Sequence, residues 1–203
     1  MVAKISLEYK FPVKYLNILY ADSTRYVTRS VANHLNDIAK KNPNIVTKIL
    51  ARWKREGLQT KKELDWISKH ALRTLIKKGH AGALSLIGFS DTTSIAVEQF
   101  WFSNEKIKII PGEALEFSCT LSASADAAVL VDYVIDFKKA NGTFKSKVYK
   151  WKQLQIKAGQ ANIISKRHIL KADATTFKLY PGEHKITVQI NGKQSSSIAF
   201  TLH

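Results

Sequence analysis

The spacing of apolar residues changes once along this chain of 203 residues, close to Ser90. Before Ser90, apolar residues recur at the three- and four-residue intervals of amphipathic helices. After it, they alternate with polar residues, as in strands that have one buried face. A run of helices followed by a run of strands is typical of an α+β protein or of two separate domains. The sequence therefore predicts a helical domain in residues 1–90 and an all-β domain in residues 91–203.

Capping and stop residues divide the first domain into helices. Thr60 and Glu63 match a capping box, because the threonine oxygen can accept from the third helical amide while the glutamate reaches back to the amide of Thr60. Elsewhere, a proline at the first helical position or a glycine just after the last one marks an end. The predicted helices are one that starts near Pro12, one from Ser23 to about Lys41, one from Pro43 to Gly57, one from Thr60 to Gly79, and a short piece from Ala81 to Ile87.

Two of these helices match one another when the sequence is shifted by about 40 residues. Tyr26 then falls on Trp66, and Leu35 falls on Leu75. A period near 40 with two helices per unit is typical of HEAT-like repeats, and a chance alignment of aliphatic positions is the alternative. Because such a stack normally needs three or more repeats, we expect residues 1–20 to form a cap or the remnant of a third repeat.

Turn residues and strict alternation predict about seven strands in the second domain. The clearest hairpin pairs residues 186–190 with residues 198–202 around Asn191-Gly192, since this dipeptide accepts the positive φ angles of a tight turn. About seven strands in about 110 residues favour an immunoglobulin-like β-sandwich. Cys119 lies in an alternating apolar run and is expected in the core, and His184 follows a turn and is expected to be structural.

The charge of the chain favours an anionic partner. Lys and Arg number 32 against 16 Asp and Glu, a net charge of +16. Residues 1–90 hold 17 basic and 6 acidic side chains, and residues 91–203 hold 15 and 10. No apolar stretch reaches the ~18 to 20 residues of a membrane span, no signal-peptide core follows Met1, and the single cysteine cannot form an internal disulfide. The sequence therefore predicts a cytoplasmic protein that binds nucleic acid and no membrane.

Two segments of the helical half, Arg29 to Lys40 (RSVANHLNDIAK) and His70 to Gly79 (HALRTLIKKG), resemble the AlkC branch of the bacterial DNA alkylation repair glycosylases. Asp132 to Ile135 and Tyr180 to His184 also resemble the immunoglobulin-like domain of that family. The resemblance covers nearly the whole chain but only part of a family protein, because AlkC-type enzymes carry further helical repeats before the part seen here. It implies HEAT-like repeats followed by an immunoglobulin-like sandwich, and it marks the chain as a C-terminal portion.

The resemblance also implies an activity, the removal of 3-methyladenine and 3-methylcytosine by cleavage of the N-glycosidic bond. A methylated base is already cationic and leaves readily, so the enzyme must mainly stabilise an oxocarbenium-like sugar and position water. A fixed carboxylate can do both, and Asp37 lies on a polar, basic helix face. Asp37 is therefore the candidate catalytic residue. The alternative is an ordinary surface aspartate paired with Lys40 or Lys41.

Further residues are candidates for contact with double-stranded DNA, mostly with its phosphates. The family usually has paired arginines where Thr28 and Arg29 stand here, and an arginine is common where Lys69 stands. The alternative for all these residues is a solvated, charged surface. The candidates are Arg29, Asn33, Asn36 and Lys40 on the first repeat, Lys69, Arg73 and Lys77 in an i, i+4, i+8 strip on the second, Lys138, Lys139 and Lys145 at a hairpin tip, and Lys166 and Arg167 in a second patch.

Other functions remain open at this point. The chain could be a non-catalytic, DNA-binding remnant, or a protein-interaction scaffold, although the charge of the helical half argues against most protein partners. No metal or cofactor is predicted, since the histidines have no ligand spacing. Trp53 and Trp66 are expected in the core rather than stacked on nucleic acid. The apolar stripe Val13, Leu16, Leu19 and Tyr20 would be partly uncovered without a preceding repeat. This predicts either self-association through this end or easier unfolding of the first 20 residues than of the β-sandwich.

Overall fold

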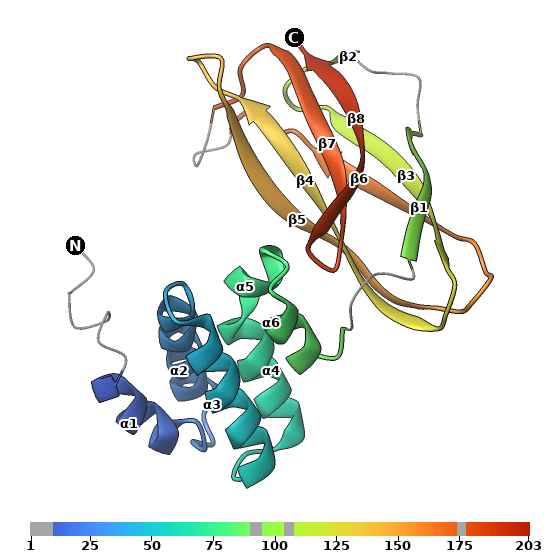
Figure 1. Cartoon of the computed structure of the whole chain (residues 1–203). Coiled ribbons are helices and arrows are strands. Elements are labelled where there is room, and N and C mark those ends of the chain that lie inside the picture. The colour runs from blue at the N-terminus through green and yellow to red at the C-terminus, as the bar shows by residue number, and fades with distance from the viewer. Residues whose placement is uncertain (1–9, 90–94, 104–107, 174–177) are drawn as a thin grey trace. The chain divides into compact units, whose positions relative to one another are not determined.

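The protein is divided into a helical unit and a unit built of strands (Figure 1). The computed structural model describes residues 10–89, 95–103, 108–173 and 178–203, which belong to two compact units, Met1–Phe89 and Ser90–His203. The predicted fold class, helices followed by an all-β immunoglobulin-like part, is confirmed. The boundary expected at residues 90 and 91 and the first nine residues of the expected N-terminal cap lie outside the described residues.

The helices begin and end close to the expected capping residues. α3 starts at Pro43 and ends at Gly57, which has the left-handed φ of +66° that a residue with a Cβ atom rarely adopts. Thr60 caps α4, since its side chain accepts a hydrogen bond from the Glu63 amide at 3.3 Å. The bounds are α1 Lys10–Leu19, α2 Arg25–Ala39, α3 Pro43–Glu56, α4 Lys61–Ala71, α5 Arg73–Lys77 and α6 Ala81–Leu86.

Two expectations about these helices are wrong. The N-cap of α2 is Thr24 rather than Ser23, because the Asp22 carboxylate accepts from both the amide and the hydroxyl of Thr24 and holds the chain extended there. The helix expected from Thr60 to Gly79 is interrupted at Leu72, where φ is −93° and ψ is 2°. The guanidinium of Arg73 donates to the carbonyl oxygen of His70 at 2.6 Å and so satisfies that carbonyl group at the break.

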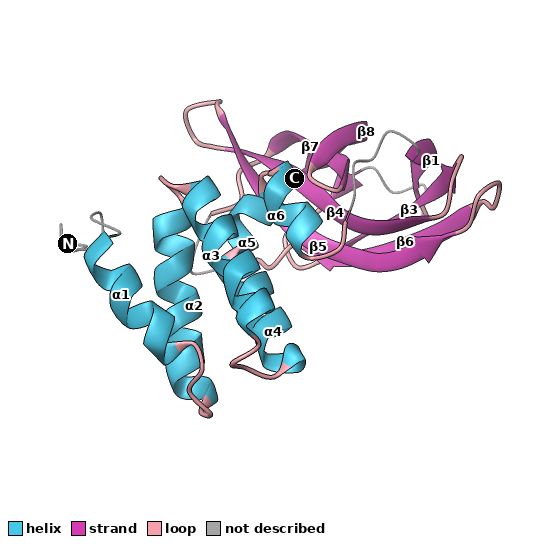
Figure 2. Cartoon of the chain, turned by 60° about the horizontal axis from the view of Figure 1, so that its bottom comes forward, coloured by secondary structure: helices cyan, strands magenta, loops and turns pink. Residues whose placement is uncertain are grey.

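Hydrogen bonds between helices occur at a nearly constant sequence separation. Asn33 pairs with His70 and Asn36 with Thr74, at separations of 37 and 38 residues. Tyr20, directly after α1, donates to Glu56 of α3, and Trp53 of α3 donates to Asn17 of α1, each at a separation of 36 residues. A constant separation requires the two segments to run in the same direction, so α1 lies parallel to α3, and α2 lies parallel to the segment formed by α4 and α5. Figure 2 shows these helices side by side.

The helical core is built from the inward faces of α2, α3 and α4. Trp53 is fully buried, as expected, and stacks on Tyr20 with ring centroids 4.1 Å apart. The apolar stripe of α1 is partly uncovered, because Leu16 and Tyr20 are buried whereas Leu19 is 41% exposed. Trp66 is not a core residue, since its side chain is only half-buried.

The second unit is a two-sheet sandwich. One sheet has the strand order β1-β3-β6, and the other has the order β2-β8-β7-β4-β5, in which only the β2–β8 pair is parallel. Eight strands are described, one more than expected, because β2 is a two-residue strand. The strands are β1 Ile95–Phe102, β2 Lys108–Ile109, β3 Ala114–Ala123, β4 Ala127–Lys138, β5 Phe144–Ile156, β6 Asn162–Ile169, β7 Gly182–Ile190 and β8 Lys193–Leu202.

The alternating residues of the two sheets form the sandwich core. Phe117 of β3 contacts Tyr133 of β4 edge to face, with ring centroids 5.1 Å apart. Cys119 is fully buried, as expected, and burial raises the pKa of its thiol to about 12. The expected hairpin joins β7 and β8 through Asn191 and Gly192, with φ of +45° and +80°. These angles are those of the tight turn that the Asn-Gly pair favours.

Candidate nucleic-acid interface

The outward face of α2 carries most of the polar residues expected on it. Arg29, Asn33, Asp37 and Lys40 are exposed. The Nζ atom of Lys40 donates to the Asp37 carboxylate at 2.6 Å, and both side chains are about half exposed. Asp37 therefore lies where a large ligand could reach it, although in the free protein its charge is partly offset by Lys40. Both features fit the catalytic expectation and the surface-aspartate alternative equally.

Asn36 does not belong to this exposed face. It is 2% exposed, and its side-chain oxygen accepts a hydrogen bond from the Thr74 amide at 3.3 Å. Thr74 is in the first turn of α5, where amides have no partner within the helix. Asn36 therefore joins α2 to α5 and cannot contact DNA through the same side chain. The sequence placed it on the polar face because a helical period alone does not show where a neighbouring helix packs.

The second repeat contributes basic residues, but not as the continuous strip that was expected. Lys69 is exposed on α4, whereas Arg73 and Lys77 lie on α5, beyond the break at Leu72. Arg73 is half-buried because its guanidinium bonds to the His70 carbonyl, and Lys77 is exposed. An i, i+4, i+8 spacing assumes one unbroken helix, so it does not align these three side chains. Lys69 lies with Lys54 and Asp65 at a pocket beside the end of α6, so Lys69, Arg73 and Lys77 are separate basic positions rather than one patch.

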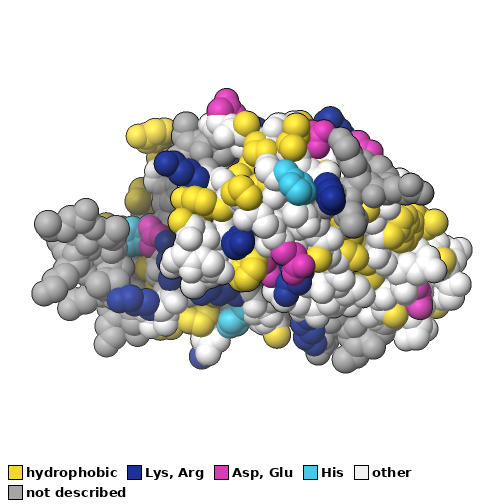
Figure 3. Space-filling view, turned by 90° about the horizontal axis from the view of Figure 1, so that it is seen from above, with side chains coloured by type: hydrophobic (Ala, Val, Ile, Leu, Met, Phe, Trp, Pro, Cys, Tyr) yellow, Lys and Arg dark blue, Asp and Glu magenta, His cyan; other side chains and the backbone are white. Residues whose placement is uncertain are grey.

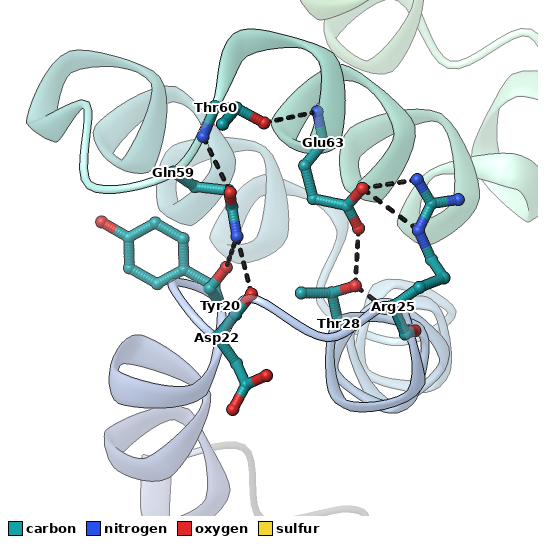
Figure 4. A network of polar contacts seen from close by, with 7 residues as sticks. All are labelled: Tyr20, Asp22, Arg25, Thr28, Gln59, Thr60 and Glu63. Carbon is teal, nitrogen blue, oxygen red and sulfur yellow. Dashed lines mark hydrogen bonds and ion pairs between the residues drawn. The ribbon is translucent and has the colours of Figure 1, made fainter.

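A network of polar contacts holds α2 against α4 beside this face (Figure 4). Glu63 does not complete the expected capping box, because the Thr60 amide donates to the Gln59 side chain instead. The Glu63 carboxylate accepts from the Arg25 Nε atom at 3.1 Å and from the Thr28 hydroxyl at 2.6 Å. Burial alone would raise the pKa of Glu63, but these two partners outweigh it and lower the pKa.

Two aromatic side chains near this network differ in accessibility. The Arg25 guanidinium lies 4.0 Å from the centre of the Trp66 ring, and Trp66 stacks on His70 at 4.8 Å. The Trp66 ring is thus already engaged within the protein. Tyr26, which the sequence analysis did not single out, is 83% exposed and next to Arg25. The only sequence signal for Tyr26 was its alignment with Trp66, another aromatic residue, when the sequence is shifted by about 40 residues.

In the β unit, five lysines line one cleft of about 460 Å³. Lys138, Lys139 and Lys145 of the expected hairpin tip are joined there by Lys147 and Lys178, and no acidic residue lines the cleft. Burial and the charge of Lys145 lower the pKa of Lys147, which is the result expected where like charges gather. Figure 3 shows one face of the molecule, on which Lys and Arg side chains are spread among apolar and acidic ones.

His184 fixes the backbone at this cleft. Its Nδ1 atom accepts from the Lys138 amide at 3.2 Å, and its Nε2 atom donates to the Tyr180 carbonyl oxygen at 2.9 Å. The ring is 1% exposed, and burial, together with the charge of Lys138, lowers its pKa. Gly182 has a φ of +121°, and a Cβ atom there would lie 2.6 Å from the Lys138 Nζ atom. The structural role expected for His184 is confirmed.

Lys166 and Arg167 do not form a joint patch. They are consecutive residues of β6, so their side chains point to opposite faces of the sheet. Arg167 is exposed and pairs with Glu116 at 3.3 Å, whereas Lys166 is half-buried on the side of His168. Only one of the two can face a given ligand.

Two kinds of site are absent from the described part of the chain. No group of three or more His, Cys, Asp or Glu residues there is placed to hold a metal ion. Among the helices described, none is both long and apolar enough to cross a membrane.

Comparison with known proteins identifies relatives of both units. The family model "Uncharacterised protein YhaZ, C-terminal Ig-like domain" matches residues 96–203. The uncharacterized protein YhaZ of Bacillus subtilis is 38% identical over 185 residues, which are 91% of this chain and 50% of YhaZ. A deferrochelatase of Shigella flexneri is 31% identical over 111 residues, or 54% of this chain and 23% of that protein.

A solved structure matches the entire chain. It is the alkylpurine DNA glycosylase AlkC of Pseudomonas fluorescens, bound to DNA that contains an abasic site analog. The two proteins are 35% identical, with a TM-score of 0.89, and the match covers 100% of this chain and 55% of AlkC. The chain thus spans about half the length of YhaZ and of AlkC. Matched by the family model over its β unit and similar to AlkC over both units, the chain belongs to the YhaZ family.

Proposed function

We propose that this chain is a DNA-binding portion of an alkylation repair glycosylase that acts on cationic N3-methylated bases in double-stranded DNA. The observation that carries the proposal is the match of the full chain to a DNA-bound glycosylase, and the half-exposed Asp37 carboxylate on a basic face is compatible with it. The proposed bases are 3-methyladenine and 3-methylcytosine.

Asp37 would act on the sugar rather than on the base. As the N-glycosidic bond lengthens, positive charge develops on the sugar, and a fixed carboxylate stabilises it. In the free protein Lys40 is bonded to Asp37 at 2.6 Å. A DNA phosphate would compete with Asp37 for Lys40. Once Lys40 moves to the phosphate, the Asp37 carboxylate keeps its full negative charge beside the cationic sugar.

The other basic side chains would bind the DNA phosphates on either side of the damaged nucleotide. In the helical unit these are Arg29, Lys40, Lys69, Arg73 and Lys77, with Asn33 as a neutral contact. The nearly constant separation of the helix-to-helix hydrogen bonds supports a HEAT-like stack, which presents one face of successive helices to a ligand. In the β unit the five-lysine cleft is the strongest candidate, with Lys166 and Arg167 as weaker ones.

Salt dependence of binding to duplex DNA tests the phosphate contacts. If about five form, the affinity should fall with log salt at a slope near −4 to −5. The double variant Lys139→Gln, Lys145→Gln should make the slope shallower by about two. Lys157→Gln is the matched control, because Lys157 follows β5 at the end of the β4–β5 hairpin away from the lysine cleft and pairs with Asp126. Binding that does not respond to salt, or an equal effect of the control, would contradict the proposal.

A second candidate is a DNA-binding protein without glycosylase activity. It is favoured by one observation, that Asp37 is paired with Lys40 at 2.6 Å, as a surface aspartate without a catalytic role would be. Excision of methylated base from duplex DNA separates the two candidates, since duplex binding without any base release would establish the second.

Two further proposals rest on the exposed apolar residues of α1 and on the single cysteine. Exposed Phe11, Ile18 and Leu19 favour self-association at high protein concentration. The free Cys119 and a DNA substrate favour the cytoplasm as the compartment.

A further inference from the structure

The five-lysine cleft of the β unit is carried by a fixed part of the backbone. One of its lysines ends β4, two lie on β5 and two lie in connecting segments: Lys138, Lys145, Lys147, Lys139 and Lys178. At the hairpin tip, the Lys139 amide donates to the Thr143 carbonyl oxygen at 2.8 Å. At the other end, the buried His184 ring accepts from the Lys138 amide. The backbone that gathers these cations is therefore in place before a ligand binds.

Lys147 is placed differently from an ordinary surface lysine. Alternation along β5 puts its side chain on the same side as that of Tyr149, which stacks on Tyr133 of β4 with ring centroids 5.3 Å apart. Lys147 is half-buried there, and Lys145, two residues away, points to the same side. Burial and the charge of Lys145 both disfavour the ammonium form and lower the pKa of Lys147. Lys147 is thus an uncharged, nucleophilic amine more often than an exposed lysine is.

The cleft can hold a small anion beside this amine. Its volume is about 460 Å³, and its described lining contains no acidic residue. The exposed Lys139, Lys145 and Lys178 can bind a phosphate group, while Phe137 and Tyr180 in the same lining can contact a short acyl chain. A molecule that carries both groups would therefore present its carbonyl carbon to Lys147.

We propose that Lys147 is an acylation site, and that its acyl donor is a small acyl phosphate bound in the five-lysine cleft. The uncharged Nζ atom of Lys147 attacks the carbonyl carbon, so that a C–N bond forms and the C–O bond to the phosphate breaks. The phosphate leaves with the electron pair of that bond and takes up the proton that the amine loses. The neighbouring lysines stabilise the charge of the leaving phosphate. The product is a neutral amide, and the cleft loses one positive charge.

The test uses the full chain without DNA and acetyl phosphate as the probe, and mass spectrometry of peptides follows the acetylation of each lysine. Lys147 should react at least about tenfold faster than Lys157, because a cleft lined by charges of one sign concentrates an oppositely charged reactant by ~10 to 10³. Lys157 is the internal control, since it is exposed and its bond to Asp126 at 2.6 Å raises its pKa. Comparable rates at the two lysines would overturn the proposal.

Two further measurements separate binding of the donor from the reactivity of the amine. Inorganic phosphate should slow the acetylation of Lys147 more than sodium chloride of equal ionic strength does, and it should leave Lys157 unaffected. p-Nitrophenyl acetate, a donor without charge, should prefer Lys147 much less than acetyl phosphate does. If phosphate gives no such protection, or if the uncharged donor shows the same preference, the selectivity comes from the amine alone and the cleft is not a donor site.

Lys145→Gln should slow the acetylation of Lys147 by at least about threefold, because it removes a phosphate ligand and the charge that favours the neutral amine. Lys150→Gln is the matched control. It makes the same change on β5, but its side chain points to the opposite side of the strand and does not line the cleft. Equal slowing in both variants would contradict the proposal, and thermal unfolding confirms that each variant is folded.

The consequence for DNA rests on the proposed function. Acetylation of Lys147 removes one cation from a proposed phosphate contact, so the acetylated chain should show a salt slope that is shallower by about one. Acetylation itself is measured without DNA. A chain that is acetylated at Lys147 but does not bind DNA would refute the proposed function alone, and a chain that binds DNA without selective acetylation would refute the acylation site alone.

Discussion

The guanidinium of Arg25 lies 4.0 Å from the centre of the Trp66 ring and is held there by the Glu63 carboxylate. One cation from α2 thus bonds to both a ring and an acid of α4. A DNA phosphate would have to compete with these contacts for Arg25, and a base could stack on Trp66 only by displacing Arg25 or His70. These residues stabilise the surface on which the proposed DNA contacts lie, and they are not themselves proposed as DNA contacts.

Glu63→Gln should destabilise the helical unit by about 1 kcal/mol. The substitution replaces the carboxylate that pairs with Arg25 by a neutral amide, and it removes one of the two oxygen atoms that accept from Arg25 and Thr28. Urea unfolding followed by circular dichroism at pH 7 measures the loss. Asp65→Asn is the control, since Asp65 makes a longer contact of 3.5 Å with Lys54 at a more exposed position. An equal loss in both variants would show that the network adds nothing beyond an ordinary surface ion pair.

The division into helices and strands was predictable because apolar spacing is a local property of the sequence. Pro43, Gly57 and Asn191-Gly192 act through their own backbone angles, and the elements that they bound were found where expected. The break at Leu72 was not predictable, because neither proline nor glycine marks it. It is supported instead by the Arg73 side chain, which donates to the His70 carbonyl oxygen. The capping box was half right for the same reason, since Arg25 and Thr28, 38 and 35 residues earlier, bind the Glu63 carboxylate.

The candidate site was predictable to the extent that it lies on one helix face. Arg29, Asn33, Asp37 and Lys40 share the exposed side of α2, as the helical period required. Asn36 was misplaced, because only the packing of α5 shows that its position is buried. Lys178 was missed, since it is 33 residues beyond Lys145 in the sequence and reaches the cleft only through the topology of the sandwich.

Asp37→Asn should abolish any base excision that the chain shows on duplex DNA with a methylated base, since the amide cannot stabilise a cationic sugar. The DNA affinity should stay equal or rise slightly, because a negative charge near phosphate is removed. Base release by chromatography and binding by fluorescence anisotropy measure the two effects. Asp65→Asn serves as the control on the same unit. Unchanged excision by Asp37→Asn would remove Asp37 from the proposed mechanism.

Cys119 should not react with a thiol reagent while the protein is folded. Its side chain is fully buried, and burial raises its pKa to about 12, so almost no thiolate forms near neutral pH. A colorimetric disulfide reagent at pH 8 should label no thiol per chain in buffer and one in concentrated guanidinium chloride. Fast labelling in buffer would mean that the β1-β3-β6 sheet opens readily.

The stability of the β unit should fall as the pH falls below about 6.5. The Tyr133 hydroxyl and the Nδ1 atom of His168 are 2.8 Å apart and join β4 to β6 across the sandwich. Burial, together with the charge of Lys166, lowers the pKa of His168 to about 4. Above pH 6.5 the ring is neutral in both the folded and the unfolded chain. Between pH 6.5 and 4 the unfolded chain binds a proton that the folded chain does not, so unfolding is favoured by at most about 1.4 kcal/mol per pH unit.

His168→Gln tests the origin of this pH dependence. Its free energy of unfolding, measured with urea at pH 7.5 and at pH 5, should differ by less than that of the parent chain. Part of the dependence should remain, because burial also lowers the pKa of His184. His203→Gln, a change at the exposed last residue, should behave like the parent. An undiminished difference in His168→Gln would mean that His168 is protonated in the folded chain as readily as in the unfolded one, and that its bond to Tyr133 survives the charge.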